Sequence, residues 1–177
     1  MIFHIRKNIN RYYKFLTGFT KIEIAVVLGV IFLLLFFVVI AIQTSRAEAR
    51  DMQRLSDVRQ LSMIVEAQYI DTPNEPLSGC EAPYSLSSAC TGPGKIQQFK
   101  KIQDPVSGNN QPCQGAASGF LSQNFCAYSV SSLDAKTQAA TNNYQICFFI
   151  ERGGIIKGFA KGIYHIETGG LLKAGCN

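Results

Sequence analysis

The sequence predicts an α+β protein, in which a long N-terminal helix packs on a small C-terminal antiparallel sheet within a disulfide-bonded head. Three observations lead to this class. Residues 24–42 form an unbroken apolar run, helical periodicity continues beyond it to Ile70, and strand-like segments with six cysteines follow. A chain of 177 residues has room for one domain and an appended segment of this kind.

The basic charge of the chain is concentrated before the apolar run. The net charge is +5, and residues 1–18 contain four basic side chains and no acidic one. The rest of the chain is almost neutral, and its longest basic run is Lys100-Lys101. Without a basic patch the chain lacks the electrostatic footprint of a phosphate-binding surface, so the sequence disfavours a nucleic-acid partner.

The apolar run predicts a membrane-spanning helix. As a helix it would be roughly 28 Å long, close to the thickness of a bilayer core. Basic residues precede it and charges of both signs follow it, which favours a cytosolic N-terminus and a single pass through the cytoplasmic membrane. A cleaved secretory signal is the alternative, but the run is long, a good cleavage site is missing, and Glu23 lies at its entrance.

Residues 44–70 predict an amphipathic continuation of the same helix, because they contain no glycine or proline. Apolar side chains recur at spacings of three or four, which places them on one face. These residues are Met52, Leu55, Val58, Leu61, Val65 and Tyr69. The opposite face is predicted to carry charges and to be exposed, with Arg50 and Arg54 near Asp57, and Glu66 further along.

Residues 71–177 predict the globular head. The sequence "DTPNEPLSG" ends the helix, and loop-forming residues prevail up to Asn124. Three later segments have the composition of strands of an antiparallel sheet, namely residues 125–131, 143–151 and 162–167.

All six cysteines lie in the head, and none of them shows the close spacing of a zinc knuckle or a redox motif. They are Cys80, Cys90, Cys113, Cys126, Cys147 and Cys176. We expect disulfides, which place the head outside the cytosol; six unpaired cysteines in a cytosolic domain are the alternative. Many connectivities are open, and we favour the sequential one, which pairs each cysteine with its neighbour along the chain.

The stretch "GFTKIE", followed by the apolar run and the amphipathic continuation, resembles the class III signal of type IV pilins and type II secretion pseudopilins. The resemblance covers residues 18–69, and it covers the head only in outline. It implies a basic leader (1–18), a transmembrane or filament-core helix (19–43), an amphipathic helix that continues into the head (44–70) and an extracytoplasmic pilin head (71–177).

This resemblance also implies a processing site and an assembly residue. Gly18 would end the leader that a prepilin peptidase removes on the cytosolic side, and Phe19 would become the N-methylated N-terminus. Glu23 would neutralise the N-terminal amine of a neighbouring subunit. Two residues depart from the pattern: Lys21 occupies a usually apolar position, and Ile40 stands where many major pilins have proline.

Further expectations concern partners. The implied partners are copies of the chain or other pilins, the peptidase, an inner-membrane assembly platform and membrane lipid, and the product is a cell-surface filament. Two alternatives stay open. One is a permanently anchored single-pass protein with a ligand-binding head, and the other is a minor pilin that binds DNA or a surface.

No enzyme and no cofactor are expected, because the two histidines, His4 and His165, make no catalytic pattern. Asp104, with Asn109 or Asn110, is a weak calcium candidate, since one carboxylate supplies few of the oxygens that this ion requires.

Overall fold

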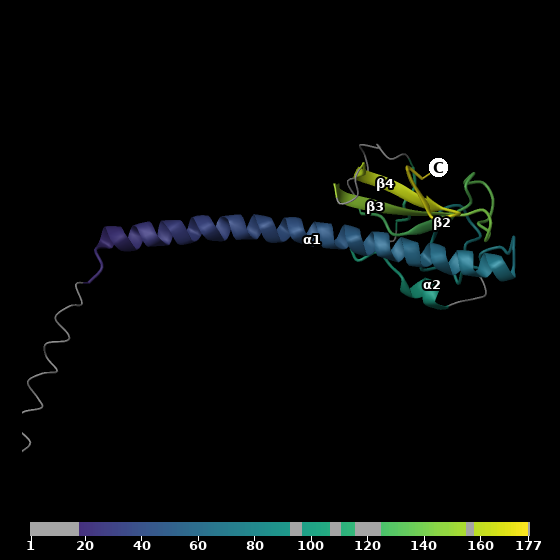
Figure 1. Cartoon of the computed structure of the whole chain (residues 1–177), viewed down its shortest axis with the longest axis horizontal. Coiled ribbons are helices and arrows are strands. Elements are labelled where there is room, and N and C mark those ends of the chain that lie inside the picture. The colour runs from purple at the N-terminus through teal and green to yellow at the C-terminus, as the bar shows by residue number, and fades with distance from the viewer. Residues whose placement is uncertain (1–17, 93–96, 107–110, 116–124, 155–157, 177) are drawn as a thin grey trace, which may run out of the picture. The chain divides into compact units, whose positions relative to one another are not determined.

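A computed structural model describes residues 18–92, 97–106, 111–115, 125–154 and 158–176. One long helix, α1, is followed by a five-stranded antiparallel sheet and a short helix, α2 (Figure 1). The chain divides into two compact units between Gln43 and Thr44. The α+β class, the long apolar helix at the N-terminal side and the small antiparallel sheet agree with the sequence.

Helix α1 spans Lys21–Asp71, a length of 51 residues. It begins after Thr20, whose side chain caps the first turn. It ends before Pro73, because a proline disfavours helical geometry in the residue that precedes it. Glycine occurs only once within the helix, at Gly29. The expected helix, Phe19 to Ile70, differs from the observed one by two residues at the start and one at the end.

The buried face of α1 in the second unit contains charged residues as well as apolar ones. It consists of Asp51, Arg54, Leu55, Val58, Leu61, Ser62 and Val65. The predicted apolar stripe is right at its centre and wrong at its ends, since Met52 is 51% exposed and Tyr69 is 44% exposed. The prediction that Arg54 lies on the exposed face is also wrong, because acidic partners from other segments surround it and leave none of it exposed.

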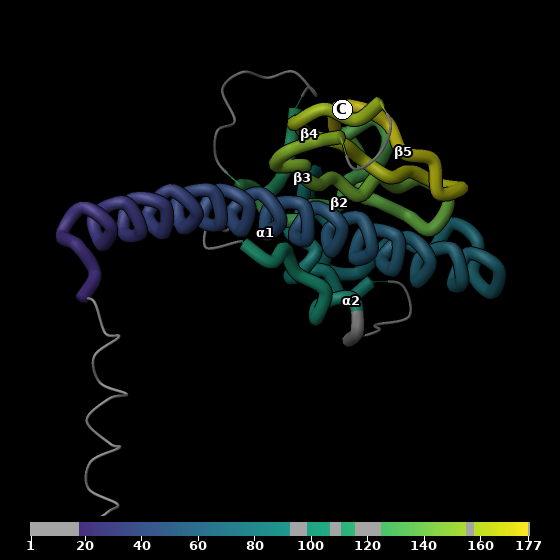
Figure 2. Tube along the Cα trace, turned by 60° about the vertical axis from the view of Figure 1, so that its left-hand side comes forward, coloured from purple at the N-terminus to yellow at the C-terminus, as the bar shows by residue number. Residues whose placement is uncertain are grey.

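The sheet follows the order of the chain, β1-β2-β3-β4-β5, and every pair of neighbouring strands is antiparallel. Its strands and α2 have the bounds β1 Ser85–Leu86, α2 Gln97–Lys101, β2 Ser129–Ser131, β3 Gln145–Gly153, β4 Ala160–Glu167 and β5 Leu171–Ala174. In both ribbon views the sheet lies along one side of the second half of α1, and α2 lies on the other side (Figures 1 and 2).

The two faces of β3 and β4 enter different cores, because side chains alternate along a strand. Ile146 and Phe148 of β3, with Ile166 of β4, join the larger core, to which Val58 and Leu61 of α1 also belong. The intervening residues face the other way and belong to a smaller core, which includes four of the six cysteines of the head. That core contains Cys113, Cys126, Cys147, Phe149, Ile163 and Cys176, with Tyr84 packed against it.

Strand prediction succeeds where the apolar pattern is long. The strands expected at 143–151 and 162–167 correspond to β3 and β4, whereas the segment at 125–131 forms a strand only over its last three residues. β1, β5 and α2 were not predicted, since each has five residues or fewer and shows little periodicity. Between Ile150 and Gly153 the register with β4 shifts, and the bulge leaves Gly153 with a φ of 69°.

Three disulfides join the head cysteines in sequential order, which confirms the predicted connectivity. They are Cys80–Cys90, Cys113–Cys126 and Cys147–Cys176. The first bridge belongs to the larger core, while the other two lie in the smaller core on the opposite face of the sheet. Each core therefore contains covalent cross-links in addition to apolar contacts.

Candidate functional site

The first candidate site is the entrance of α1, where a capped helix start meets an acidic side chain. Gly18 and Phe19 are exposed and precede the helix. The hydroxyl of Thr20 accepts a hydrogen bond from the Glu23 amide at 3.3 Å, and the Thr20 carbonyl accepts one from the Ile24 amide at 3.2 Å. Thr20 is therefore the N-cap, and Glu23 is the third residue of the helix.

This arrangement matches the S/T-x-x-E pattern of a capping box, which starts helices by satisfying backbone amides that have no partner in the first turn. Glu23 is the acidic residue of that turn, where the helix dipole favours a negative charge. The predicted site residues do not include Thr20, although the spacing of Thr20 and Glu23 is that of a helix cap.

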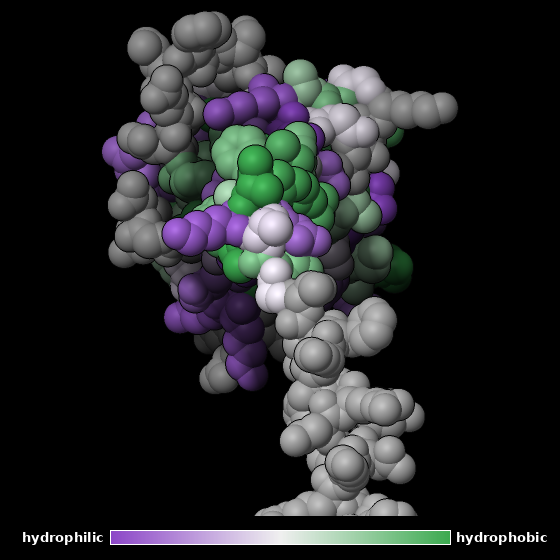
Figure 3. Space-filling view, turned by 90° about the vertical axis from the view of Figure 1, so that its left-hand side faces the viewer, coloured by the Kyte–Doolittle hydropathy of each residue, from purple (hydrophilic) through white to green (hydrophobic). Residues whose placement is uncertain are grey.

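The helix surface that follows Glu23 is apolar and exposed. Every residue from Ile24 to Ile42 is exposed, and α1 contains a segment long and apolar enough to cross a membrane. Figure 3 looks onto this end of the helix, where apolar side chains gather. Such a surface is stable only against lipid or against other apolar side chains.

A second site, in the head, is a buried ion network around Arg54. Its Nε lies 2.6 Å from Oδ2 of Asp104, and its Nη1 lies 2.9 Å from Oδ1 of Asp51 and 2.7 Å from Oε1 of Glu151. Arg50 adds two hydrogen bonds to Glu151, at 2.9 and 2.6 Å. The network joins α1, the segment after α2 and the end of β3.

The carboxylate of Asp51 extends the network to the backbone of β3. It accepts hydrogen bonds from the amides of Glu151 and Arg152 at 2.8 and 3.0 Å. These amides lie at the bulge between Ile150 and Gly153, where the ladder to β4 is interrupted. Because buried amides need acceptors, Asp51 replaces a partner that the bulge removes from the sheet.

The electrostatics of this network favour its ionised form. Burial lowers the pKa of Arg54, but the hydrogen bonds and charges of Asp104 and Glu151 outweigh burial and raise it above its ordinary value. Burial raises the pKa of Glu151, and the hydrogen bonds from Arg50 and Arg54 outweigh it, so that the net shift is downward. A buried ion pair is costly to separate, since the remaining charge would stay buried without a partner.

The calcium candidate Asp104 belongs to this network. Its carboxylate is bound by Arg54 and also accepts a hydrogen bond from the Val106 amide at 2.8 Å. Asn109 and Asn110 lie outside the described residues. Among the residues that the structure describes, no group of three or more histidines, cysteines or acids is placed to hold a metal ion. In this structure Asp104 is therefore the ion-pair partner of Arg54.

A third set of contacts fastens the second half of α1 to the sheet. Tyr144 contacts the Ser62 hydroxyl at 2.9 Å and donates a hydrogen bond to Glu66 at 3.1 Å. Glu66 also accepts a hydrogen bond from the amide of Gly169, at the turn between β4 and β5, at 3.0 Å. Burial, followed by the charge of Glu66, raises the pKa of Tyr144, so that it remains a neutral donor.

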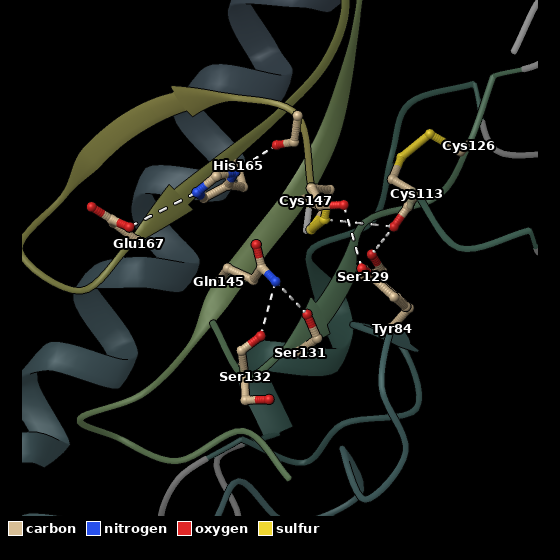
Figure 4. Close-up of a disulfide and its surroundings, with 12 residues drawn as sticks. Tyr84, Cys113, Cys126, Ser129, Ser131, Ser132, Gln145, Cys147, His165 and Glu167 are labelled. Atoms are coloured by element: carbon tan, nitrogen blue, oxygen red, sulfur yellow. Dashed lines mark hydrogen bonds and ion pairs between the residues drawn. A yellow bond between two sulfur atoms is a disulfide. The ribbon is translucent and has the colours of Figure 1, made fainter. Parts of the chain in front are cut away.

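The segment around Cys176 is held against the smaller core by covalent and polar contacts. Figure 4 shows the surroundings of Cys147, its disulfide partner. Cys176 forms the bridge to Cys147, and its amide and carbonyl exchange hydrogen bonds with Gly115 at 2.7 and 3.0 Å. The Tyr84 hydroxyl donates to the same carbonyl at 3.3 Å. The hydroxyl of Ser129 donates to the Cys113 carbonyl, which joins the neighbouring bridge to β2.

His165 makes structural contacts in the same region. It is buried on β4, and its Nδ1 lies 2.5 Å from the Gly175 carbonyl, so that Nδ1 is the donor. Its Nε2 lies 3.9 Å from the Glu167 carboxylate, which also pairs with Lys173 at 2.5 Å. These contacts position the chain that leads from β5 to Cys176.

Hydrogen bonds of Tyr144, Ser129 and His165 join neighbouring segments of the head. The arrangement can pack, pair charges and cross-link. Comparisons with protein-family models, with curated proteins and with solved structures found no match for this chain.

Proposed function

We propose that this chain is a structural subunit, a major or minor pilin or a pseudopilin, of a type IV pilus-like surface filament or a secretion or uptake pseudopilus. One observation carries the proposal. Glu23 is an acidic residue in the first turn of a helix whose next residues are apolar and exposed, and Gly18 and Phe19 immediately precede its cap. The proposed role is structural rather than enzymatic.

In this proposal a prepilin peptidase cleaves after Gly18, and Phe19 becomes the methylated N-terminus. The new α-amine then lies at the N-terminal end of α1, where the helix dipole is already positive. A cation at that end is unfavourable, and it becomes more so once apolar side chains surround it. The Glu23 carboxylate of a neighbouring copy would offset the charge of the α-amine and the positive end of the helix dipole. This interaction favours assembly of the copies in one register.

The head supports an extracytoplasmic location. Disulfides persist in oxidising compartments, and all six cysteines of the head are paired. The basic residues before α1 favour a cytosolic N-terminus, so the helix would cross the cytoplasmic membrane once before an assembly platform transfers it into a filament. The partners would be copies of this chain or other pilins.

The mass of the N-terminal peptide from cells that produce the chain tests the processing step. We expect a chain that begins with methylated Phe19. A chain that retains Met1, or that is cut after the apolar run, would contradict the proposal and would favour a permanently anchored protein or a secreted one.

Filament formation tests the assembly step. We expect Glu23→Gln to reduce surface filaments strongly while membrane insertion and cleavage stay normal. Glu48→Gln is the matched control, because Glu48 lies on the same helix, and its only described ion pair is a long contact of 3.6 Å with Arg152. Equal filament yields from the two variants would exclude a role of Glu23 in assembly.

A further inference from the structure

Lys21 and Glu23 place opposite charges on opposite sides of the start of α1. They are the first and third residues of the helix, and both are exposed. Each residue of an α-helix is rotated by about 100° from the one before, so these side chains point about 200° apart. Residues two positions apart on a helix do not face each other. Within the described part of the chain, neither side chain has an ion-pair partner.

One helix cannot neutralise these two charges by itself, but a parallel copy beside it can. The Lys21 side of one copy is complementary to the Glu23 side of the next, and the apolar surface from Ile24 to Ile42 is exposed below both. The two residues differ in height by only about 3 Å along the axis, so the pair forms between copies at nearly the same level. Each copy then has one unpaired charge left on its far side, and the contact can repeat.

We propose that Lys21 pairs with Glu23 of an adjacent parallel copy, and that this ion pair brings the helices together in the membrane. The inference rests on the proposed function, because its partner is a second copy of the same chain. In this pairing Glu23 has a cationic partner before the leader is cleaved. The ammonium group of Lys21 is present in the uncleaved chain, whereas the α-amine of Phe19 appears only after residues 1–18 are removed.

This pairing would also explain why a cation, Lys21, lies where the surrounding surface is apolar. A lone charge next to a membrane core is costly, and an isolated Lys21 would add to that cost. A pair at the edge of the lipid-exposed surface reduces the cost for both residues. The chain would therefore associate laterally as a precursor and exchange Lys21 for the new α-amine as a partner of Glu23 after cleavage.

The test uses the purified uncleaved full chain in phosphatidylcholine vesicles, with an equimolar mixture of isotopically heavy and light copies. A carbodiimide joins an amine to a carboxylate only in direct contact. We expect mass spectrometry to detect an amide between Lys21 of a light copy and Glu23 of a heavy one. Heavy–light cross-links that lack this amide would overturn the proposal.

Neutral variants provide an independent test by energy transfer between labelled copies. Lys21→Gln and Glu23→Gln should each associate about two- to five-fold more weakly than the parent chain, in the range of exposed ion pairs. A mixture of the two variants should recover part of that loss, because one copy supplies Glu23 and the other supplies Lys21. A mixture no better than either variant alone would overturn the proposal. Circular dichroism checks that both variants keep α1 helical.

The two proposals fail in different ways. If the amide between copies is absent but cells still cleave after Gly18 and Glu23→Gln still abolishes filaments, only the Lys21 pairing is wrong. If the amide forms but the chain is never cleaved in cells, the pairing stands as a contact of a permanently anchored protein, and the filament function is wrong.

Discussion

Arg54 and Asp104 lie 50 residues apart in the chain, yet the Nε of one is 2.6 Å from the Oδ2 of the other, and neither side chain is exposed. This pair connects the second half of α1 to the segment that follows α2. Glu151 of β3 and Asp51 of α1 also contact the same guanidinium, so one residue of the helix connects to two other parts of the head and to the turn before it.

Replacing Arg54 should therefore be among the most destabilising single changes in the head. We expect Arg54→Met to cost about 3 to 5 kcal/mol, since it leaves the buried carboxylates without their cation. Denaturant unfolding of the detergent-solubilised chain, followed by the tyrosine signal in circular dichroism, would measure this loss. Arg59→Met is the matched control, as Arg59 is exposed on the same helix. A loss below about 1 kcal/mol would show that the network contributes little.

The pH dependence of stability should reveal the ionised state of Glu151. Its pKa is lower in the folded chain, where burial opposes ionisation but Arg50 and Arg54 favour it more strongly. A lowered pKa contributes stability above the unfolded pKa, about 4.3 for glutamate, and that contribution is lost as the pH falls through the folded value. We expect Glu151→Gln to be less stable than the parent chain at pH 7.

The difference between these two chains should shrink below about pH 4, where protonation removes the charge from the parent as well. The pKa of Asp57 shifts upward, opposite to that of Glu151, because burial raises it more than the hydrogen bond with Tyr128 lowers it. Parallel unfolding curves of the parent and Glu151→Gln from pH 7 to pH 3 would measure the effect. A difference that stays constant over this range would contradict it.

The contacts of Tyr144 should stabilise the junction between α1 and the turn after β4. Tyr144→Phe removes the hydroxyl that reaches Ser62 and Glu66, and we expect a loss of about 1 to 2 kcal/mol. Hydrogen exchange should speed up at the Gly169 amide, which Glu66 also binds. Tyr69→Phe is the control, because Tyr69 is exposed on the same helix. Unchanged exchange at Gly169 would show that Glu66 is held without Tyr144.

The first and the last disulfide along the chain should differ in how much they stabilise the head. Cys147 and Cys176 are separated by 29 positions and Cys80 and Cys90 by 10, and the longer loop restricts the unfolded chain more. Chain entropy predicts a total of about 3 to 4 kcal/mol for the longer bridge, about 1 kcal/mol more than for the shorter one. Paired cysteine-to-serine variants, compared by denaturant unfolding, test this order, which the opposite ranking would contradict.

The parts of the fold that the sequence predicted are those with a local cause. The apolar run and the absence of helix breakers predict α1, and the apolar segments of β3 and β4 predict two long strands. Arg54 shows where this reasoning fails. Its position among charged neighbours suggested a solvated face, but acidic residues distant in the chain bury it, and nothing near Arg54 indicates them.

The candidate site at the start of α1 is more local and was more predictable. Glu23 was singled out because an acid at the entrance of an apolar helix is unusual. Thr20 was missed, although its distance from Glu23 is that of a capping box. The short strands β1 and β5 were missed for another reason, since they depend on hydrogen bonds from neighbouring strands rather than on their own composition.

The Cys147–Cys176 bridge also bears on the order of events in the proposed export of the head. Strands β4 and β5 lie between its two cysteines, so in the proposed orientation both would have to cross the membrane before the bridge closes. In the proposed orientation, α1 already lies in the bilayer at that time. In that orientation, oxidation of Cys176 would thus record that the chain up to this residue has arrived outside.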